Sequence, residues 1–171
     1  VVPHGMIQPS PDTRIDGWDA CSGYYYADST INGFSHTHVS GTGCCDYGDV
    51  LLMPTVGKQQ YRTTDPQSQR LAYASSFSHK NEIAEPGYYS VFLDTYQVKA
   101  EISSTKRGAI HRYTFPENTE SGFIIDLDYS LQRQTNSEME IEVISDTEIC
   151  GHKKTTYWAF DQYINFYAKF S

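Results

Sequence analysis

The stretch FSHTHVSGTGCCDYGD, residues 34–49, gathers residue types that could do chemistry. His36 and His38 stand two residues apart, a glycine-containing loop follows, and adjacent cysteines and two aspartates close the stretch. Side chains two apart on an extended backbone point to the same face, and imidazole, thiolate and carboxylate groups are all zinc ligands. The stretch is therefore a candidate metal site, catalytic site or wall of a sugar pocket.

The metal and nucleophile interpretations have specific weaknesses. Structural zinc sites normally present two separated ligand pairs such as C-x₂-C, and the sequence holds no second pair of this kind. Hydrogen bonding of both histidines within the loop is a plainer alternative. Ser40 does not fit a nucleophile turn, because G-x-S-x-G needs glycine two residues before the serine and His38 stands there.

Carboxylates close in sequence could serve a glycosidase, which needs two carboxyl groups about 5–10 Å apart. Such pairs occur at Asp46 and Asp49, Glu82 and Glu85, and Asp126 and Asp128. Most neighbouring carboxylates, however, are solvated surface charge or turn residues. None of these pairs specifically indicates a catalytic site.

A sugar pocket is the third interpretation. A sugar ring offers an apolar face and a fringe of hydroxyls, so its sites combine an aromatic platform with short polar side chains. The segment GWDACSGYYYADSTINGFSHTH has this composition, with Trp18 as the platform. The alternative for Trp18 is a place in the hydrophobic core, and composition alone leaves both possibilities open.

The composition excludes other classes of function. The 171 residues carry 13 Lys and Arg against 21 Asp and Glu, a formal charge of −8, without a basic cluster. Binding along a phosphate backbone needs such a cluster, so we expect no nucleic-acid partner. No apolar run approaches the ~18 residues that cross a bilayer, and we expect no membrane span. A chain of this size can form one domain that buries roughly 70% of its unfolded surface.

The two ends of the sequence suggest a piece of a longer polypeptide. Both ends are apolar and strand-like, whereas the termini of whole proteins are usually looser. The start lacks the pattern of a signal peptide, which could stand in the missing part. The four cysteines, Cys21, Cys44, Cys45 and Cys150, do not form a convincing disulfide framework, so we expect buried free thiols.

Alternating β-branched and aromatic residues predict strands throughout the second half. The predicted strands are Tyr88–Asp94, Val98–Ser104, Gly108–Pro116, Gly122–Tyr129, Met139–Ser145, Thr147–Lys153 and Tyr163–Phe170. In MEIEVIS, Met139, Ile141 and Val143 alternate with glutamates, which predicts a half-buried strand. Regular turn signals favour an all-β sandwich or barrel. In the loop-rich segment 9–64 only Val50–Val56 clearly predicts a strand, and we expect this half to supply working loops.

Several long motifs resemble the N-terminal domain of the glycoside hydrolase family 92 α-mannosidases. They are GMIQPSPDTR, GWDACSGYYYADSTINGFSHTHVSGTGCCDYGDVLLMPT, FSHKNEIAEPGYYSVFLDTYQVKAEISST, RGAIHRYTFP and WAFDQYINFYAKFS. The resemblance spans nearly the whole chain. Motifs as long as GFSHTHVSGTG are far more specific than the short patterns considered above.

The resemblance implies a fold and a function. It implies that residues 1–171 form an antiparallel β-sandwich of the galactose-mutarotase-like supersandwich type, packed on an (α/α)₆ barrel absent from this sequence. The implied enzyme is an inverting, calcium-dependent exo-α-mannosidase of the α-1,2 type, acting on N-glycan or mannan α-mannosides. Its catalytic carboxylates and Ca²⁺ ligands belong to the barrel, so we expect no catalytic residue and no metal ligand here. The implied location is the periplasm or the exterior of a bacterium.

Carried over motif by motif, the resemblance implies substrate-binding residues but no catalytic ones. The candidates are Trp18, Asp19, His36, His38, Ser40 and Gly41. Trp18 is expected to contact the sugar, and the others to face the pocket or the seam between domains. A free-standing carbohydrate-binding sandwich is the competing function.

The sequence also departs from the family pattern. Ala20 stands where a further aromatic residue is expected, and Cys44 and Cys45 occur together after SGTG. A glycine- and histidine-rich segment expected before VVPHGM is missing. These departures leave the fold prediction unchanged, but they bear on linkage specificity and on where the domain begins.

Overall fold

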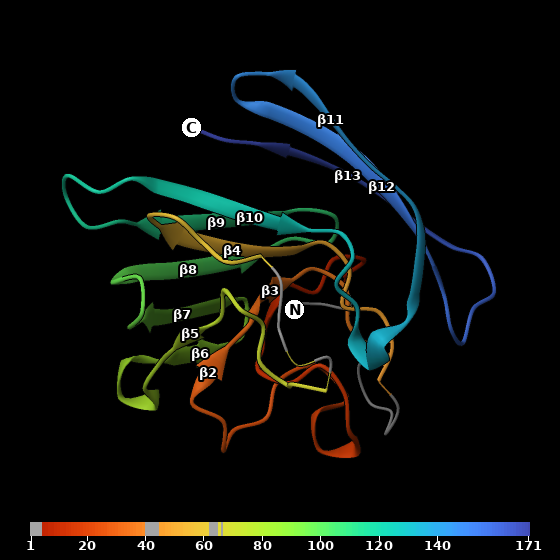
Figure 1. Cartoon of the computed structure of the whole chain (residues 1–171), viewed down its shortest axis with the longest axis horizontal. Helices are drawn as coiled ribbons and strands as arrows, with labels where there is room; N and C mark the ends of the chain where they lie inside the picture. The colour runs from red at the N-terminus through yellow and green to blue at the C-terminus, as the bar shows by residue number, and fades with distance from the viewer. Residues whose placement is uncertain (1–4, 40–44, 62–64, 66) are drawn as a thin grey trace.

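The computed structural model describes residues 5–39, 45–61, 65 and 67–171, and in this part the protein is built from antiparallel strands. Two four-stranded sheets form the body (Figure 1). The first has the order β1 (Ser10–Asp12), β3 (Gly33–Ser35), β4 (Leu51–Val56), β10 (Ser121–Asp126). The second runs β6 (Ile83–Glu85), β7 (Tyr88–Leu93), β8 (Val98–Ser104), β9 (Ala109–Thr114). The all-β, antiparallel prediction is confirmed.

Shorter elements and a third sheet complete the fold. β2 (Thr30–Ile31) pairs with β5 (Ser75–Ser76), and 3₁₀ turns occur at η1 (Trp18–Ala20), η2 (His79–Asn81) and η3 (Leu131–Arg133). The third sheet has the order β11 (Thr135–Ser145), β12 (Glu148–Thr156), β13 (Gln162–Lys169), and it curves along one side of the body (Figure 1). No helix long and apolar enough to span a membrane occurs among the described residues.

The hydrophobic core lies between the two four-stranded sheets. Phe34 of β3 and Leu51 and Met53 of β4 are fully buried, as are Val91 of β7 and Val98 of β8. These residues come from strands with alternating or continuous apolar patterns, which direct their side chains to one shared layer. The sheets are therefore a fixed support for the loops that leave their ends.

A buried ion pair joins the third sheet to the body. Lys153 of β12 places Nζ 3.0 Å from Oδ1 of Asp49, and both side chains are fully buried. The same ammonium group donates to the carbonyl oxygen of Tyr129 at 2.8 Å. Asp49 also accepts hydrogen bonds from the hydroxyl groups of Thr37 and Thr155. The pair is thus surrounded by the partners that a buried charge requires.

The third sheet has one apolar face. Residues opposite one another on neighbouring strands share a face, and two rows define it: Ile141, Gly151 and Phe166, then Val143, Ile149 and Ala168. We call the five members with side chains larger than hydrogen the apolar third-sheet face. The alternate rows carry polar groups, including Glu140 opposite His152.

The predicted burial of Met139–Ser145 is wrong. The strand forms as predicted, but Met139 is 42%, Ile141 40% and Val143 72% exposed. Alternation of apolar and polar residues shows which side chains share a face, whereas burial depends on what packs against that face. In the described part of the chain, nothing covers Val143 and its neighbours on this face, so they remain exposed to solvent.

Candidate functional site

The GWD motif forms a single exposed turn. η1 follows Gly17, whose φ of 110° lies in a region that favours glycine, and no side chain caps the turn. Trp18 is 77% exposed. The alternative that Trp18 belongs to the core is therefore wrong, and its ring is accessible to a ligand.

Arg14 holds both ends of the loop that carries this turn. Its guanidinium donates to both carboxylate oxygens of Asp28 at 2.9–3.3 Å and pairs with Asp19 at 3.2 Å. It also lies 4.0 Å from the ring centroid of Tyr25. The hydrogen bonds to Asp28 are the main reason that the pKa of Arg14 is raised. Asp19 is thus fixed beside Trp18 while its side chain stays largely exposed.

The two ends of the loop 39–45 lie beside the turn. Ser22 Oγ donates to the carbonyl oxygen of Val39 at 3.1 Å, and Cys45 Sγ donates to that of Gly17 at 3.2 Å. The structure therefore places Val39 and Cys45, the described residues on either side of the SGTG motif, close to the Trp18 turn. Three predicted or noted positions in this loop lie outside the described residues: Ser40, Gly41 and Cys44.

The other cysteines have distinct settings. Cys21 and Cys150 are free thiols, as predicted, but they are partly exposed, so the prediction that they are buried is wrong. Cys21 Sγ donates to the carbonyl oxygen of Trp18 at 2.9 Å. Cys45 is buried, and this burial raises the pKa of its thiol.

His38 is a buried structural residue. Its Nδ1 donates to the carbonyl oxygen of Gln8 at 2.7 Å, and its Nε2 lies 2.8 Å from Asp12 and 3.0 Å from Ser35. Burial opposes the charged imidazole, but the Asp12 carboxylate prevails and raises the pKa of His38. A Ser-His-Asp triad uses different ring nitrogens for its serine and its aspartate. Here both share Nε2 and all three side chains are buried, so the cluster is no nucleophile.

His36 belongs to a directed chain of hydrogen bonds. Its Nδ1 lies 2.6 Å from the carbonyl oxygen of Val50, which can only accept, so its Nε2 accepts from Nε2 of His111 at 3.1 Å. Nδ1 of His111 then accepts from the hydroxyl group of Tyr113 at 2.7 Å. Burial lowers the pKa of His36, and burial together with His36 lowers that of His111 to about 3. Both rings are therefore neutral at pH 7.

The histidines thus match the plainer alternative of hydrogen bonding within the fold. His111 and Tyr113 come from β9, and the SHTH motif itself gives no sign of these partners. A contact of His36 or His38 with substrate or with another domain stays a prediction. The ring nitrogens of both histidines are already hydrogen-bonded within the protein. Such a contact would therefore use the ring faces or the neighbouring backbone.

The carboxylates noted in the sequence mostly have structural partners. Asp46 accepts from the amide group of Gln134 at 2.6 Å, and Asp49 forms the buried pair with Lys153. Asp126 accepts from the hydroxyl group of Tyr73 at 2.5 Å. These partners place the carboxylates in the framework of the fold.

Glu82 joins the Trp18 loop to the second sheet, a role that the sequence did not reveal. Its carboxylate accepts from Tyr24 at 3.0 Å, from Tyr89 at 2.7 Å and lies 2.6 Å from Nδ1 of His79. His79 in turn stacks on Tyr26, with 4.3 Å between ring centroids. Burial and the hydrogen bond to Glu82 raise the pKa of Tyr24. Aromatic loop residues are thereby fixed to β6 and β7.

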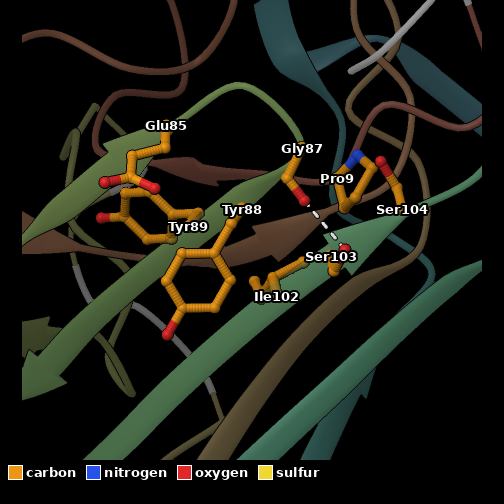
Figure 2. A pocket seen from close by; sticks show the side chains of 8 residues that line it. All are labelled: Pro9, Glu85, Gly87, Tyr88, Tyr89, Ile102, Ser103 and Ser104. Atoms are coloured by element: carbon orange, nitrogen blue, oxygen red, sulfur yellow. Dashed lines mark hydrogen bonds between the residues drawn. The ribbon is translucent and has the colours of Figure 1, made fainter.

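A small pocket is lined by residues of β6, β7 and β8, by Gly87 in the turn between β6 and β7, and by Pro9, which precedes β1 (Figure 2). Its lining residues are Pro9, Glu85, Gly87, Tyr88, Tyr89, Ile102, Ser103 and Ser104. Ser103 Oγ donates to the carbonyl oxygen of Gly87 at 2.8 Å, as the dashed line in Figure 2 marks. The hydroxyl group of Tyr88 donates to Glu101. These polar groups are already engaged, so the pocket is a weaker candidate for a ligand than the Trp18 turn.

Metal binding requires several ligands in one place. Across residues 5–39, 45–61, 65 and 67–171, no group of three or more His, Cys, Asp or Glu side chains is arranged to hold an ion. His36 and His38, the pair that first suggested zinc, point their ring nitrogens at partners within the protein.

Comparisons with known proteins agree with this architecture. The family model described as the glycosyl hydrolase family 92 N-terminal domain matches residues 1–171. A family 92 α-mannosidase from Bacteroides thetaiotaomicron, solved in complex with mannoimidazole, has a TM-score of 0.91 and 38% identity, covering 99% of this chain and 22% of that chain. A family 92 inverting mannosidase from B. thetaiotaomicron VPI-5482 has a TM-score of 0.70 and 28% identity, with 89% and 18% covered.

A curated relative shows similarity in sequence as well. An uncharacterized secreted glycosidase of Arthroderma benhamiae is 29% identical over 120 residues, which cover 68% of this chain and 15% of that protein. The chain thus spans between 15% and 22% of the length of this relative and of the two solved structures.

Proposed function

Because the chain belongs to glycosyl hydrolase family 92 as an N-terminal domain, we propose that it completes the mannose-binding pocket of an α-mannosidase. The catalytic (α/α)₆ barrel is a further domain of the same polypeptide in this proposal, and residues 1–171 form one sandwich domain. The full-length enzyme is an inverting exo-α-mannosidase, and this chain alone has no measurable turnover.

The observation that carries the proposal is the exposed Trp18 on a fixed turn. An isolated domain gains nothing for its own stability from a tryptophan that is 77% exposed. The same ring gives a sugar an apolar platform, and Asp19 beside it offers acceptor oxygens to hydroxyl groups. The Arg14 contacts fix Asp19 and the loop before ligand arrives, which lowers the ordering cost of binding.

The exposed apolar residues support an interdomain contact. The apolar third-sheet face carries Val143, which is 72% exposed, and Ile110 of β9 is also 72% exposed. Phe160, in the connection between β12 and β13, is 84% exposed. Neighbouring apolar groups left exposed, as on the apolar third-sheet face, are typical of a surface that another body covers, whereas single exposed residues such as Ile110 and Phe160 are common on any protein. The proposed cover is the barrel domain.

The proposed chemistry divides between the two domains. Inversion uses an acid and a base about 6.5–9.5 Å apart, which leaves room for water on the far face of the sugar. The proposal places both carboxylates in the barrel, while Trp18 and Asp19 bind and orient the terminal mannose. Correct orientation contributes to rate because a misplaced substrate rarely reaches the reactive geometry.

Calcium is part of the proposal, and its oxygen ligands are proposed to lie in the barrel domain. Among the described residues, no group of three or more His, Cys, Asp or Glu side chains is arranged to hold an ion. Ca²⁺ is a hard cation that takes oxygen ligands, sugar hydroxyls among them. The proposed substrates are N-glycan or mannan α-mannosides, with α-1,2 linkages as the proposed type. The proposed location is outside the bacterial cytoplasm, since a curated relative is a secreted glycosidase.

A ligand titration separates this proposal from a free-standing carbohydrate-binding module. We expect mannoimidazole, measured by isothermal titration calorimetry with Ca²⁺ present, to bind the full-length protein at least about 100-fold more tightly than this chain alone, a difference of about 2.7 kcal/mol. Most pocket contacts come from the barrel in our proposal. Equal affinity for the isolated chain would support the free-standing module instead.

A further inference from the structure

We propose that Gln69 is a positioning residue for the Trp18 turn, and that it sets the affinity of the enzyme for mannosides through this turn. The inference rests on the proposed function, because it takes Trp18 as a sugar contact. Gln69 lies in a different loop, 51 residues further along the chain than Trp18, and its hydrogen bonds go to none of the predicted site residues that the structure describes.

The turn cannot hold its own orientation. η1 is a single 3₁₀ turn of three residues without a side-chain cap, and short 3₁₀ segments are weakly stabilised. Gly17 precedes it, which gives the backbone the greatest conformational freedom of any residue. The exposed Trp18 ring adds no packing that would fix the turn. Its direction is therefore set by contacts from outside the turn, which include the Arg14 pair with Asp19 and the contacts of the residues just before it.

Gln69 forms three hydrogen bonds to Ile15 and Asp16, the two residues before Gly17. Its Oε1 accepts from the backbone N–H of Ile15 at 2.8 Å and from that of Asp16 at 3.1 Å. Its Nε2 donates to Oδ1 of Asp16. One amide group thus fixes the backbone and the side chain of the residue directly before Gly17. Glutamate at this position would lose the donor and place a second negative charge beside Asp16.

Gln69 is itself held from the buried part of the fold. Asn32, which is fully buried, donates from Nδ2 to the carbonyl oxygen of Gln69 at 2.8 Å and accepts from the backbone N–H of Leu71 at 2.8 Å. Asn32 lies between β2 and β3. The core strands therefore define where the Gln69 amide group sits, and the amide group defines where the Trp18 turn begins.

A second loop reaches the same point. Nε of Arg133 lies 2.8 Å from Oδ2 of Asp16, and the guanidinium also donates to the carbonyl oxygen of Ser68 at 2.8 Å. The backbone N–H of Gln132 donates to the carbonyl oxygen of Ile15 at 2.8 Å. The ion pair is about one-third exposed, so it is a weak contributor by itself. Together, Gln69 and Arg133 contact both carboxylate oxygens of Asp16, and Gln69 makes the larger number of hydrogen bonds to this segment.

The test uses Gln69→Ala in the full-length enzyme. We expect KM for an α-mannoside to rise about tenfold while kcat changes less than about twofold, because a loosened turn weakens ground-state and transition-state binding alike. Gln59→Ala is the matched control, since Gln59 also anchors a loop by hydrogen bonds to the carbonyl oxygens of Val56 and Gly57. The control is expected to keep the wild-type KM.

A double-mutant cycle with Trp18→Ala identifies the route of the effect. In the Trp18→Ala background, Gln69→Ala is expected to change KM less than about twofold, because a positioning residue has nothing left to position. Hydrogen–deuterium exchange should also show faster exchange of the amides of Ile15 and Asp16 in Gln69→Ala alone.

The outcomes separate the two proposals. If Trp18→Ala raises KM but Gln69→Ala does not, or if their effects on KM simply add, Gln69 does not act through the turn and this inference fails. If Trp18→Ala leaves KM unchanged, the proposed sugar contact fails first. Faster exchange at Ile15 and Asp16 would then still show that Gln69 holds the turn, but its proposed effect on affinity would be overturned.

Discussion

Replacing Trp18 with alanine in the full-length enzyme is expected to lower kcat/KM for α-mannosides by about 10- to 100-fold. Burying a large apolar side chain against a ligand contributes about 1.5–3 kcal/mol, and each 1.36 kcal/mol corresponds to a factor of ten in rate. Steady-state kinetics with a synthetic α-mannoside measures the effect. Because Trp18 is 77% exposed, its loss should change the free energy of unfolding by less than about 0.5 kcal/mol.

Tyr61→Ala is the control for this prediction. Tyr61 is 71% exposed and lies after β4, outside both the GWD motif and the elements proposed to contact the barrel. Its replacement is expected to change kcat/KM less than about threefold. Wild-type kinetics for Trp18→Ala, with a folded sandwich confirmed by circular dichroism, would contradict the role of Trp18 as a sugar contact.

Replacing Lys153 with methionine is expected to destabilise this domain by about 3–5 kcal/mol. Methionine has a similar volume, but it leaves the fully buried Asp49 carboxylate without its cation, and breaking one side of a buried ion pair has a cost of this size. Urea unfolding of the chain, followed by tyrosine and tryptophan fluorescence, measures the change. Such a loss is a large part of the total stability of a domain.

Two further variants separate charge from packing at this pair. Lys154→Met alters the neighbouring lysine, which pairs with exposed Asp161 at the surface, and should unfold close to the wild type. Asp49→Asn in the Lys153→Met background removes the unpaired charge and should recover part of the lost stability. A Lys153→Met chain as stable as the wild type would mean that the pair does not hold the third sheet to the body.

Strands could be predicted because their signal is local. Val98–Ser104 shows a period of two in its own residues, and the structure gives a strand with the same bounds. The burial of Met139–Ser145 could not be predicted in this way, because the partner of an apolar face does not appear in the strand's own sequence. A strand could therefore be predicted from its own residues, whereas the burial of its apolar face could not.

The candidate site shows the same division. The GWD and SHTH motifs predicted the loops of the candidate site, and a role of these loops in sugar binding stays a prediction. A hydrogen bond from Ser22 to Val39 places the two segments close together. The pairing of His36 with His111, 75 positions apart, has no signal in a single sequence. The hydrogen bond between Gln69 and Ile15, which lie 54 positions apart, has no such signal either. These contacts depend on how the sheets bring distant loops together, which motif spacing does not encode.

Hydrolysis of an α-mannoside, with and without Ca²⁺, by this chain alone and by the full-length protein tests the central claim most directly. We predict that only the full-length protein releases mannose, that a chelator abolishes this activity, and that added Ca²⁺ restores it. Release of mannose by the isolated chain would contradict the account, because the catalytic carboxylates would then have to lie among residues 1–171.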